Sequence, residues 1–407
     1  MSMTRPTLGG PRRFNVGEGT GLEARAVGAR PDAPRGLRVH HCGMAQGYGR
    51  PDFAAVLAAA GLVVAAVGCA GSHADKAGGS RPEKPVVLTL AAHDNDEAYA
   101  TFVAAVGRLS HGSIRIRIAE GWGNTGDRRE LDYERRLVGA VRAGKEQLGI
   151  VGVRVWDTLG VDSFQALVSP FLIDSLDLER RAIESPEATP AMATIGRAGV
   201  VGIALLPGRL RRPLGITRPL IAVDDYRRAK IGARPSAVAW RTFRALGAHP
   251  ASYVAGVLSG FDGAELDSLT ISQNDYDEGA RALTGNVVLW PKPQTIVMNR
   301  RAYGSLTPAQ RQILRDAGRE SVEPELERIA RDQRLGLSIV CAAKLHVVSA
   351  SPADLAALRE AVRPVYDQIR RDPLTRRWIA RINHVKATQP ASPDIARCPS
   401  RRERKTG

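Results

Sequence analysis

Basic residues beside a predicted helix start are the clearest candidates for chemistry in this chain. Lys230 to Ala233 has the pattern of a short strand, and Ala237 to Leu246 has that of a helix that Ser236 is placed to cap. The free N–H groups and the positive dipole of a helix N-terminus attract anions. Arg234 lies in the turn between the two segments, and a guanidinium can hold a carboxylate through two parallel hydrogen bonds. We therefore predict an anion-binding site at this turn, with Arg234 as a ligand-binding residue.

Two glycine-rich segments resemble phosphate-binding loops. Gly121 to Gly126 fits the pattern G-x-G-x-x-G before a predicted helix, so a nucleotide-dependent enzyme is an alternative hypothesis. However, this loop follows the second predicted strand rather than the first, and Asp127 and Glu130 would repel a pyrophosphate. Gly139 to Lys145 fits G-x-x-x-x-G-K, but Glu146 replaces the Ser or Thr that binds magnesium. The sequence therefore favours a protein without a nucleotide cofactor.

Other motifs of catalysis are missing from the sequence. It holds no H-E-x-x-H, no G-x-S-x-G and no Cys/His spacing typical of a metal site. The four cysteines show no spacing that indicates a disulfide framework, and Cys341, in an apolar helical run, is interpreted as a buried thiol. We expect no catalytic residue, no metal and no cofactor.

The net charge of +16 over 407 residues is unevenly distributed. Residues 1–43 hold seven Arg and three acids (7 − 3 = +4), and residues 397–405 hold five bases and one acid (5 − 1 = +4). Half of the charge thus lies in residues 1–43 and 397–405, and the composition of the two terminal segments, residues 1–43 and 389–407, predicts disorder. No basic patch with interleaved aromatic residues accompanies it, so we do not expect nucleic-acid binding.

The segment 44–69 has the pattern of an export signal, and Met44 is a candidate for the true start. The apolar run Phe53 to Val67 has the length of a signal core rather than of a membrane span. It ends at Cys69 in a sequence that resembles a bacterial lipobox, so Cys69 is the predicted lipidation site. An uncleaved anchor helix is the alternative. Residues 70–85 have the composition of a polar tether, and we expect an exported domain anchored to the membrane by lipid.

Strands and helices alternate along the remaining chain, which predicts an α/β fold with a largely parallel sheet. The periodicity predicts strands at Val86 to Ala91, Ser113 to Ala119 and Leu148 to Val153. Two later helices begin with capping boxes and a proline at the first helical position, at Thr307 and Ser351.

Several segments in this order resemble the extracytoplasmic solute-binding proteins of TRAP (tripartite ATP-independent periplasmic) transporters. Those segments are Asp224 to Pro250, Ser169 to Leu172, Asp262 to Glu265, Val297 to Pro308 and Val362 to Asp372, and the resemblance spans about Val86 to Ala387. It implies a two-lobed fold of the periplasmic-binding-protein type II class, with the ligand cleft between the lobes. The expected lobes are residues 86–208 with 292–340, and residues 209–291 with 341–388.

The resemblance also implies positions for ligand contacts. Arg211 matches a second cleft arginine of the family. The family's first cleft arginine is replaced here by Gly232, and Arg234 is the nearest substitute because residues i and i+2 of a strand share a face. Further residues fall at cleft-lining positions or have the apolar character of a pocket wall: Arg154, Glu265, His93, Asn95, Trp156, Phe171 and Trp290.

The function implied is capture of a small organic acid anion and its delivery to TRAP-type permease subunits in the membrane. No chemistry is expected in such a protein. Two alternatives remain open: an exported nucleotide-dependent enzyme that uses the loop at residues 121–126, and a ligand sensor of the same fold.

Overall fold

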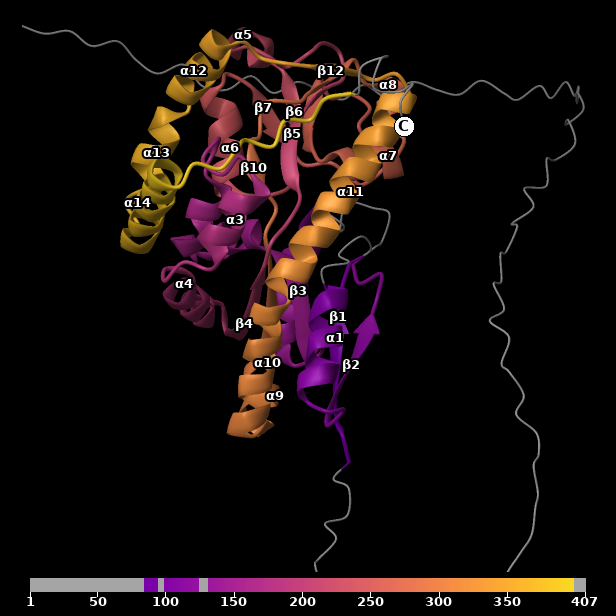
Figure 1. Ribbon diagram of the computed structural model, residues 1–407, viewed down its shortest axis with the longest axis vertical. Helices are drawn as coiled ribbons and strands as arrows, with labels where there is room; N and C mark the ends of the chain where they lie inside the picture. Colours follow the sequence, from indigo (N-terminus) through magenta and orange to yellow (C-terminus); the bar gives the residue numbers. More distant parts are fainter. Residues whose placement is uncertain (1–83, 94–98, 124–130, 399–407) are drawn as a thin grey trace, which may run out of the picture. The chain divides into compact units, whose positions relative to one another are not determined.

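A computed structural model describes residues 84–93, 99–123 and 131–398 of the chain (Figure 1). The predicted export signal with Cys69, most of the tether, and Asn95 lie outside the described residues. Among the helices that are described, none is both long enough and apolar enough to cross a membrane.

The first sheet has five strands in the described part of the chain, in the order β2-β1-β3-β11-β4. β1 pairs in parallel with β2 and β3, whereas β11 runs antiparallel to both of its neighbours. The sheet is therefore mixed: β11 runs against the other four strands, which share the one direction that the prediction of a largely parallel sheet requires. The strands are Val86–Ala91 (β1), Ile114–Ala119 (β2), Leu148–Gly152 (β3), Val200–Leu206 (β4) and Gln294–Asn299 (β11).

Side-chain burial in this sheet follows strand position. Every residue of β3 is buried, as expected for a central strand covered on both faces. β2 lies at the edge, so its isoleucines turn inward while Arg115 and Arg117 are exposed. Helices α1 (Tyr99–Leu109) and α10 (Pro308–Glu320) cover one face and place Phe102 and Leu314 in a single core with Leu90.

The second sheet has the order β12-β9-β5-β8-β6-β7, and β10 also pairs with β5. β5 is antiparallel to β8, β9 and β10, while the outer pairs β6–β7 and β9–β12 are parallel. The strands are Leu210–Gly215 (β5), Lys230–Gly232 (β6), His249–Ala251 (β7), Gly263–Leu266 (β8), Ala282–Thr284 (β9), Trp290–Pro291 (β10) and His346–Val348 (β12).

Two chain segments pass between the sheets side by side, one from β4 to β5 and one from β10 to β11. At Gly208 they approach so closely that a Cβ atom would lie 1.6 Å from the carbonyl oxygen of Lys292. Only glycine fits this contact, because the obstacle is backbone rather than a movable side chain.

Helices surround both sheets. The two helices with the clearest start signals in the sequence begin where those signals predict. Thr307 and Ser351 form capping boxes at the starts of α10 and α12. The described α-helices are Tyr99–Leu109 (α1), Tyr133–Ala143 (α2), Leu176–Ile183 (α3), Ala188–Thr194 (α4), Val223–Tyr226 (α5), Ala237–Ala245 (α6), Ser268–Gln273 (α7), Tyr276–Gly279 (α8), Arg300–Ser305 (α9), Pro308–Glu320 (α10), Val322–Ala342 (α11), Pro352–Ala361 (α12), Arg363–Ile369 (α13) and Pro373–Thr388 (α14). Short 3-10 helices within the described ranges lie at Val153–Leu159 (η2), Asp162–Val168 (η3) and Ile195–Ala198 (η4).

The C-terminal strap, defined as residues 389–398, lies on the folded protein instead of forming the predicted disordered tail. It runs from the end of α14 toward the end of α11 (yellow in Figure 1). The Asp394 carboxylate accepts a hydrogen bond from the Leu176 N–H at 2.9 Å, and its carbonyl accepts one from buried Arg212 at 2.8 Å. The Ala396 N–H donates to the Gly285 carbonyl at 3.0 Å. The prediction of disorder from residue 389 onward is therefore wrong for residues 389–398.

A disulfide joins Cys341, at the end of α11, to Cys398 at the end of the strap. The interpretation of Cys341 as a free buried thiol is thus wrong. Sequence spacing contains no indication of this pair, because its two cysteines are 57 residues apart and meet only after α14 has turned the chain back.

Glu179 on α3 is a buried carboxyl group that fixes one of the crossing segments. One of its oxygens accepts a hydrogen bond from the Gly208 N–H at 2.8 Å, while Oε2 has no hydrogen-bond partner in the described structure. Burial, reinforced by the charges of Asp394 and Glu325, raises the pKa of Glu179 well above its usual value.

This raised pKa predicts a pH-dependent effect of Glu179→Gln. When folding raises the pKa of a carboxyl group, the protein's free energy of unfolding falls as the pH rises from the group's unfolded pKa to its folded pKa. The fall is about 1.4 kcal/mol for each pH unit between those two values. The variant lacks this loss, so its free energy of unfolding should gain on that of the parent as the pH rises above about 4, the ordinary pKa of a glutamate side chain. Urea unfolding across this range tests the prediction, and parallel pH profiles for the two proteins would refute it.

Candidate functional site

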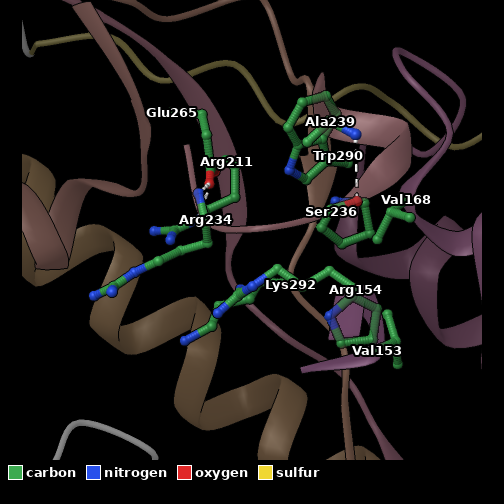
Figure 2. A pocket seen from close by; sticks show the side chains of 12 residues that line it. Val153, Arg154, Val168, Arg211, Arg234, Ser236, Ala239, Glu265, Trp290 and Lys292 are labelled. Carbon is green, nitrogen blue, oxygen red and sulfur yellow. Dashed lines mark hydrogen bonds and ion pairs between the residues drawn. The ribbon is translucent and has the colours of Figure 1, made fainter. Parts of the chain in front are cut away.

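One pocket lies between residues that follow strands of both sheets (Figure 2). The segment after β3 contributes η2 and η3, and the turn after β6 contributes Arg234 and the start of α6. Strands β5, β8 and β10 and the two residues after β10 supply the remainder. The lining residues are Val153, Arg154, Val168, Arg211, Arg234, Ser236, Ala239, Glu265, Trp290, Pro291, Lys292 and Pro293.

Arg211 on β5 is buried in this pocket between two carboxylates. Its Nε lies 3.0 Å from Glu265 and its Nη1 lies 2.6 Å from Asp267. Burial by itself would lower the pKa of Arg211, but Glu265 and Asp267 outweigh burial and raise it. The guanidinium is therefore permanently charged and already neutralised by groups of the protein.

Arg154 in η2 is the second buried guanidinium, and it is also paired. Its Nη2 lies 3.0 Å from Glu134, whose carboxylate also accepts a hydrogen bond from the Gly152 N–H at 2.8 Å. Although burial works in the opposite direction, Glu134 raises the pKa of Arg154. This pair holds the segment after β3 against α2.

Arg234 differs from both because no carboxylate pairs with it among the described residues. Its guanidinium lies 5.0 Å above the ring of Tyr253, and its closest acceptor is the Tyr253 carbonyl at 3.5 Å. A negatively charged ligand can thus approach Arg234 without breaking an ion pair, which is not true of Arg211 or Arg154.

Gly232 and Tyr253 belong to the same local arrangement. A Cβ atom at position 232 would lie 3.1 Å from the Tyr253 ring and 3.4 Å from the Cβ of Ala264. The missing side chain at 232 therefore leaves the space in which Tyr253 packs, and Tyr253 in turn supports Arg234.

The N-terminus of α6 is occupied by a carboxylate of the protein itself. Asp157 in η2 accepts hydrogen bonds from the N–H groups of Ala237 and Val238, at 2.9 and 3.0 Å, and from the Ser236 hydroxyl at 2.9 Å. The expectation that these N–H groups bind the ligand's anion is corrected here, because Asp157 already satisfies them. The sequence predicted an anion at this helix start, and the structure supplies it from within the chain.

Replacing Asp157 by alanine is expected to lower the free energy of unfolding by about 1–3 kcal/mol, because buried N–H groups of α6 would lose their acceptor. Asp157→Asn should cost less, since one oxygen acceptor remains. Asp367→Ala, which changes an exposed acid of α13, is the matched control and should change stability by less than about 0.5 kcal/mol. Equal urea midpoints for Asp157→Ala and this control would contradict the assignment.

The other predicted site residues are distributed between the pocket and the core. Glu265 and Trp290 line the pocket together with the three arginines. Trp156 and Phe171 do not line it: both lie in the core, where the Trp156 Nε1 donates a hydrogen bond to Thr295 at 3.0 Å. His93 is buried against Tyr133, with ring centroids 4.2 Å apart, and also lies outside the lining.

Four residues that shape the site are absent from the sequence predictions: Asp267, Glu134, Tyr253 and Asp157. Asp267 follows Glu265 at the i+2 spacing of a strand, so its presence on the same face was predictable from the alternation. Contacts of the other three join segments distant in sequence, and no local pattern indicates them.

The pocket as it stands is almost closed. The space enclosed by its walls is about 10 Å³, which is close to the minimum for one water molecule. Sites for organic ligands usually measure about 300–1,000 Å³. An organic acid can therefore enter only if the walls move apart. The described residues contain no group of acids, histidines or cysteines that could hold a metal ion.

These features define a class: a two-sheet α/β binding protein with a cationic pocket between segments from both sheets. The model of the family described as "Bacterial extracellular solute-binding protein, family 7" matches residues 95–372. The chain belongs to this family, the solute-binding proteins of TRAP transporters, so the predicted resemblance and the two-lobed fold are confirmed.

Solved structures share the fold at low sequence identity. A TRAP periplasmic solute-binding protein from Ochrobactrum anthropi, with the C-terminus bound in the ligand-binding pocket, matches with a TM-score of 0.65 and 19% identity, covering 75% of this chain and 97% of that one. One from Xanthobacter autotrophicus, with bound β-D-galacturonate, matches with a TM-score of 0.63 and 21% identity, covering 73% and 99%.

A relative known by sequence is the uncharacterized protein YiiZ of Salmonella typhimurium, 24% identical over 254 residues, or 60% of this chain and 76% of that protein. The family and the solved relatives are solute-binding proteins rather than enzymes.

Proposed function

We propose that this protein captures a small hydroxylated organic acid and that Arg234 holds the acid's carboxylate. The observation that carries the proposal is the contrast among the three pocket arginines. Arg211 and Arg154 are neutralised by Glu265, Asp267 and Glu134, whereas Arg234 has only a carbonyl and an aromatic face as partners. A guanidinium that is partly buried without a counter-ion gains most from a carboxylate ligand.

Glu265 supports the hydroxyl part of the proposal. Its Oε2 is buried and lies 3.0 Å from the Arg211 Nε, yet neither atom has a hydrogen-bond partner in the described structure. A hydroxyl group of the ligand can donate to this oxygen and satisfy it. Acids of this kind, such as β-D-galacturonate, are bound in the structures of several relatives.

The nearly closed pocket supports capture by hinge motion. We take as lobes residues 86–208 with 292–340, and residues 209–291 with 341–388, which separate the two sheets. Opening would part the segment after β3 from β5 and β8 and would release the hydrogen bonds that Asp157 accepts from the start of α6. Ligand binding would then favour the closed form, because only that form brings Arg154 and Arg234 to the same molecule.

Export, lipid anchoring at Cys69 and delivery to a TRAP-type permease complete the proposed function. The Cys341–Cys398 disulfide supports export independently of the leader sequence, because such bonds persist mainly in oxidising compartments. Family membership supports the permease as the receiving partner.

Thermal unfolding of the purified protein in the presence of candidate ligands tests this function. D-galacturonate, D-glucuronate and D-erythronate represent hydroxylated acids, D-galactose is the uncharged counterpart, and NAD and ATP represent the nucleotide alternative. We expect the unfolding temperature to rise with at least one acid and to stay unchanged with D-galactose. A rise with NAD or ATP, and none with any acid, would support an enzyme instead.

A further inference from the structure

A second cavity, of about 670 Å³, lies beside β4 and shares no residue with the pocket described above. We call it the β4 groove. Helix α4 and helix α10 pack against β4 from different sides, and Figure 1 shows the strand between them. The groove is lined by residues of β4, α4 and η4, by the end of α3 with the two residues after it, by the α9–α10 segment and by the first residue of α11.

Two glycines allow α4 and α10 to pack closely against β4, while the outer edge of β4 stays free of a neighbouring strand in the described structure. The groove lies at this free edge. At Gly202 a Cβ atom would lie 2.9 Å from Met192 of α4, and at Gly318 of α10 it would lie 2.6 Å from Ala204. β4 is the last strand in its sheet, so no described strand fills the space between the helices.

Most of the wall is apolar, but two guanidiniums in it have no acidic partner. Arg300 donates to the Gly196 carbonyl, and Arg315 donates to the Tyr303 hydroxyl and to Gln312. Neither forms an ion pair among the described residues. Arg319, by contrast, is paired with Asp316, and the groove's acid Glu184 is paired with Arg180. The charge left uncompensated in the groove is therefore positive.

An added peptide strand is a poor fit for this edge. The pairing of β4 with β11 shifts register at Ile203, which is the extra residue of a β-bulge. Bulges twist an edge strand and are a common means of preventing further strand pairing. The volume instead lies within the range of small-molecule sites.

We propose that the β4 groove binds an amphipathic monoanion, with a carboxylate or similar head at Arg300 and Arg315 and an aliphatic body along the apolar wall. Met192, Val201 and Val322 are representative of that wall. This site is independent of the pocket that contains Arg234, and its ligand differs by requiring an apolar body rather than hydroxyl groups.

Calorimetric titration of the full-length protein with laurate, below its micelle concentration, tests the proposal. The double variant Arg300→Gln/Arg315→Gln should weaken laurate binding at least tenfold. Arg319→Gln is the matched control, because that arginine lines the same groove but already has a carboxylate partner, and it should change binding less than twofold. Ala193→Trp, which places a large side chain at the exposed wall of α4, should also weaken binding.

Two further comparisons complete the test. Dodecanol should bind at least tenfold more weakly than laurate, and Arg234→Ala should leave laurate binding unchanged. Circular dichroism identifies any variant that fails to fold, and Ala193→Trp gives a test that leaves the charges in place. The proposal is overturned if laurate does not bind the parent, if the double variant binds as tightly as the parent, or if Arg234→Ala abolishes binding.

Discussion

Replacing Arg234 by alanine is expected to weaken binding of the organic acid by about 100-fold or more, equivalent to about 2.7 kcal/mol. Charge-assisted hydrogen bonds contribute about 1.5–3 kcal/mol each, and Arg234 can offer two to a carboxylate. Because the guanidinium has no ion pair in the described structure, its removal leaves no buried acid unpaired. Titration calorimetry with the acid that best stabilises the parent measures the effect.

Arg244→Ala is the matched control for this prediction. Arg244 is an exposed arginine of α6, so the substitution removes the same charge from the same region without altering the pocket. It should change the dissociation constant less than threefold, and equal losses for the two variants would indicate a general field effect instead. Arg211→Ala is a weaker test, because it would leave Glu265 and Asp267 buried without their cation and destabilise the fold.

Loss of the Cys341–Cys398 disulfide is expected to lower the free energy of unfolding by about 4 kcal/mol. This magnitude follows from the entropy of closing a loop across a sequence separation of 57 residues. The strap would lose its anchor on α11, and the hydrogen bonds of Asp394 and Ala396 would have to hold it alone. Urea unfolding of Cys341→Ser/Cys398→Ser and of the parent measures the difference.

A reducing agent provides the control for this second prediction. Dithiothreitol should lower the stability of the parent toward that of the double variant and leave the variant itself unchanged. A parent whose unfolding midpoint does not respond to the reductant, and equals that of the double variant, would show that the strap contributes nothing to stability.

The elements themselves were largely predictable because their signals are local. The fully apolar run at 148–152, the alternating Ile and Arg of β2 and the capping boxes at Thr307 and Ser351 each depend on neighbours within a few residues. The structure reproduces all four features.

The failures concern pairings between distant segments. Cys398 lies in a basic, proline-containing segment whose composition predicts disorder, yet a cysteine 57 residues earlier anchors it. Asp157 occupies the helix start at which the sequence pattern predicts a ligand, although 79 residues separate it from Ser236. Local patterns show which groups need a partner, but they do not show which partner the fold brings.

The arginines illustrate the same limit within the site. Sequence reasoning placed Arg211, Arg234 and Arg154 near one cleft, and all three line one pocket. It could not show that Arg211 faces two internal carboxylates and Arg154 one, because Glu134, Glu265 and Asp267 come from other segments. That difference is what selects Arg234 as the proposed ligand contact.

The most direct test is a crystal structure of the protein with the organic acid that raises its unfolding temperature most. Our account predicts a carboxylate held by the Arg234 guanidinium at about 3 Å, with a ligand hydroxyl directed at Glu265. A carboxylate bound elsewhere, with Arg234 still resting on Tyr253 and making no contact with the ligand, would contradict it.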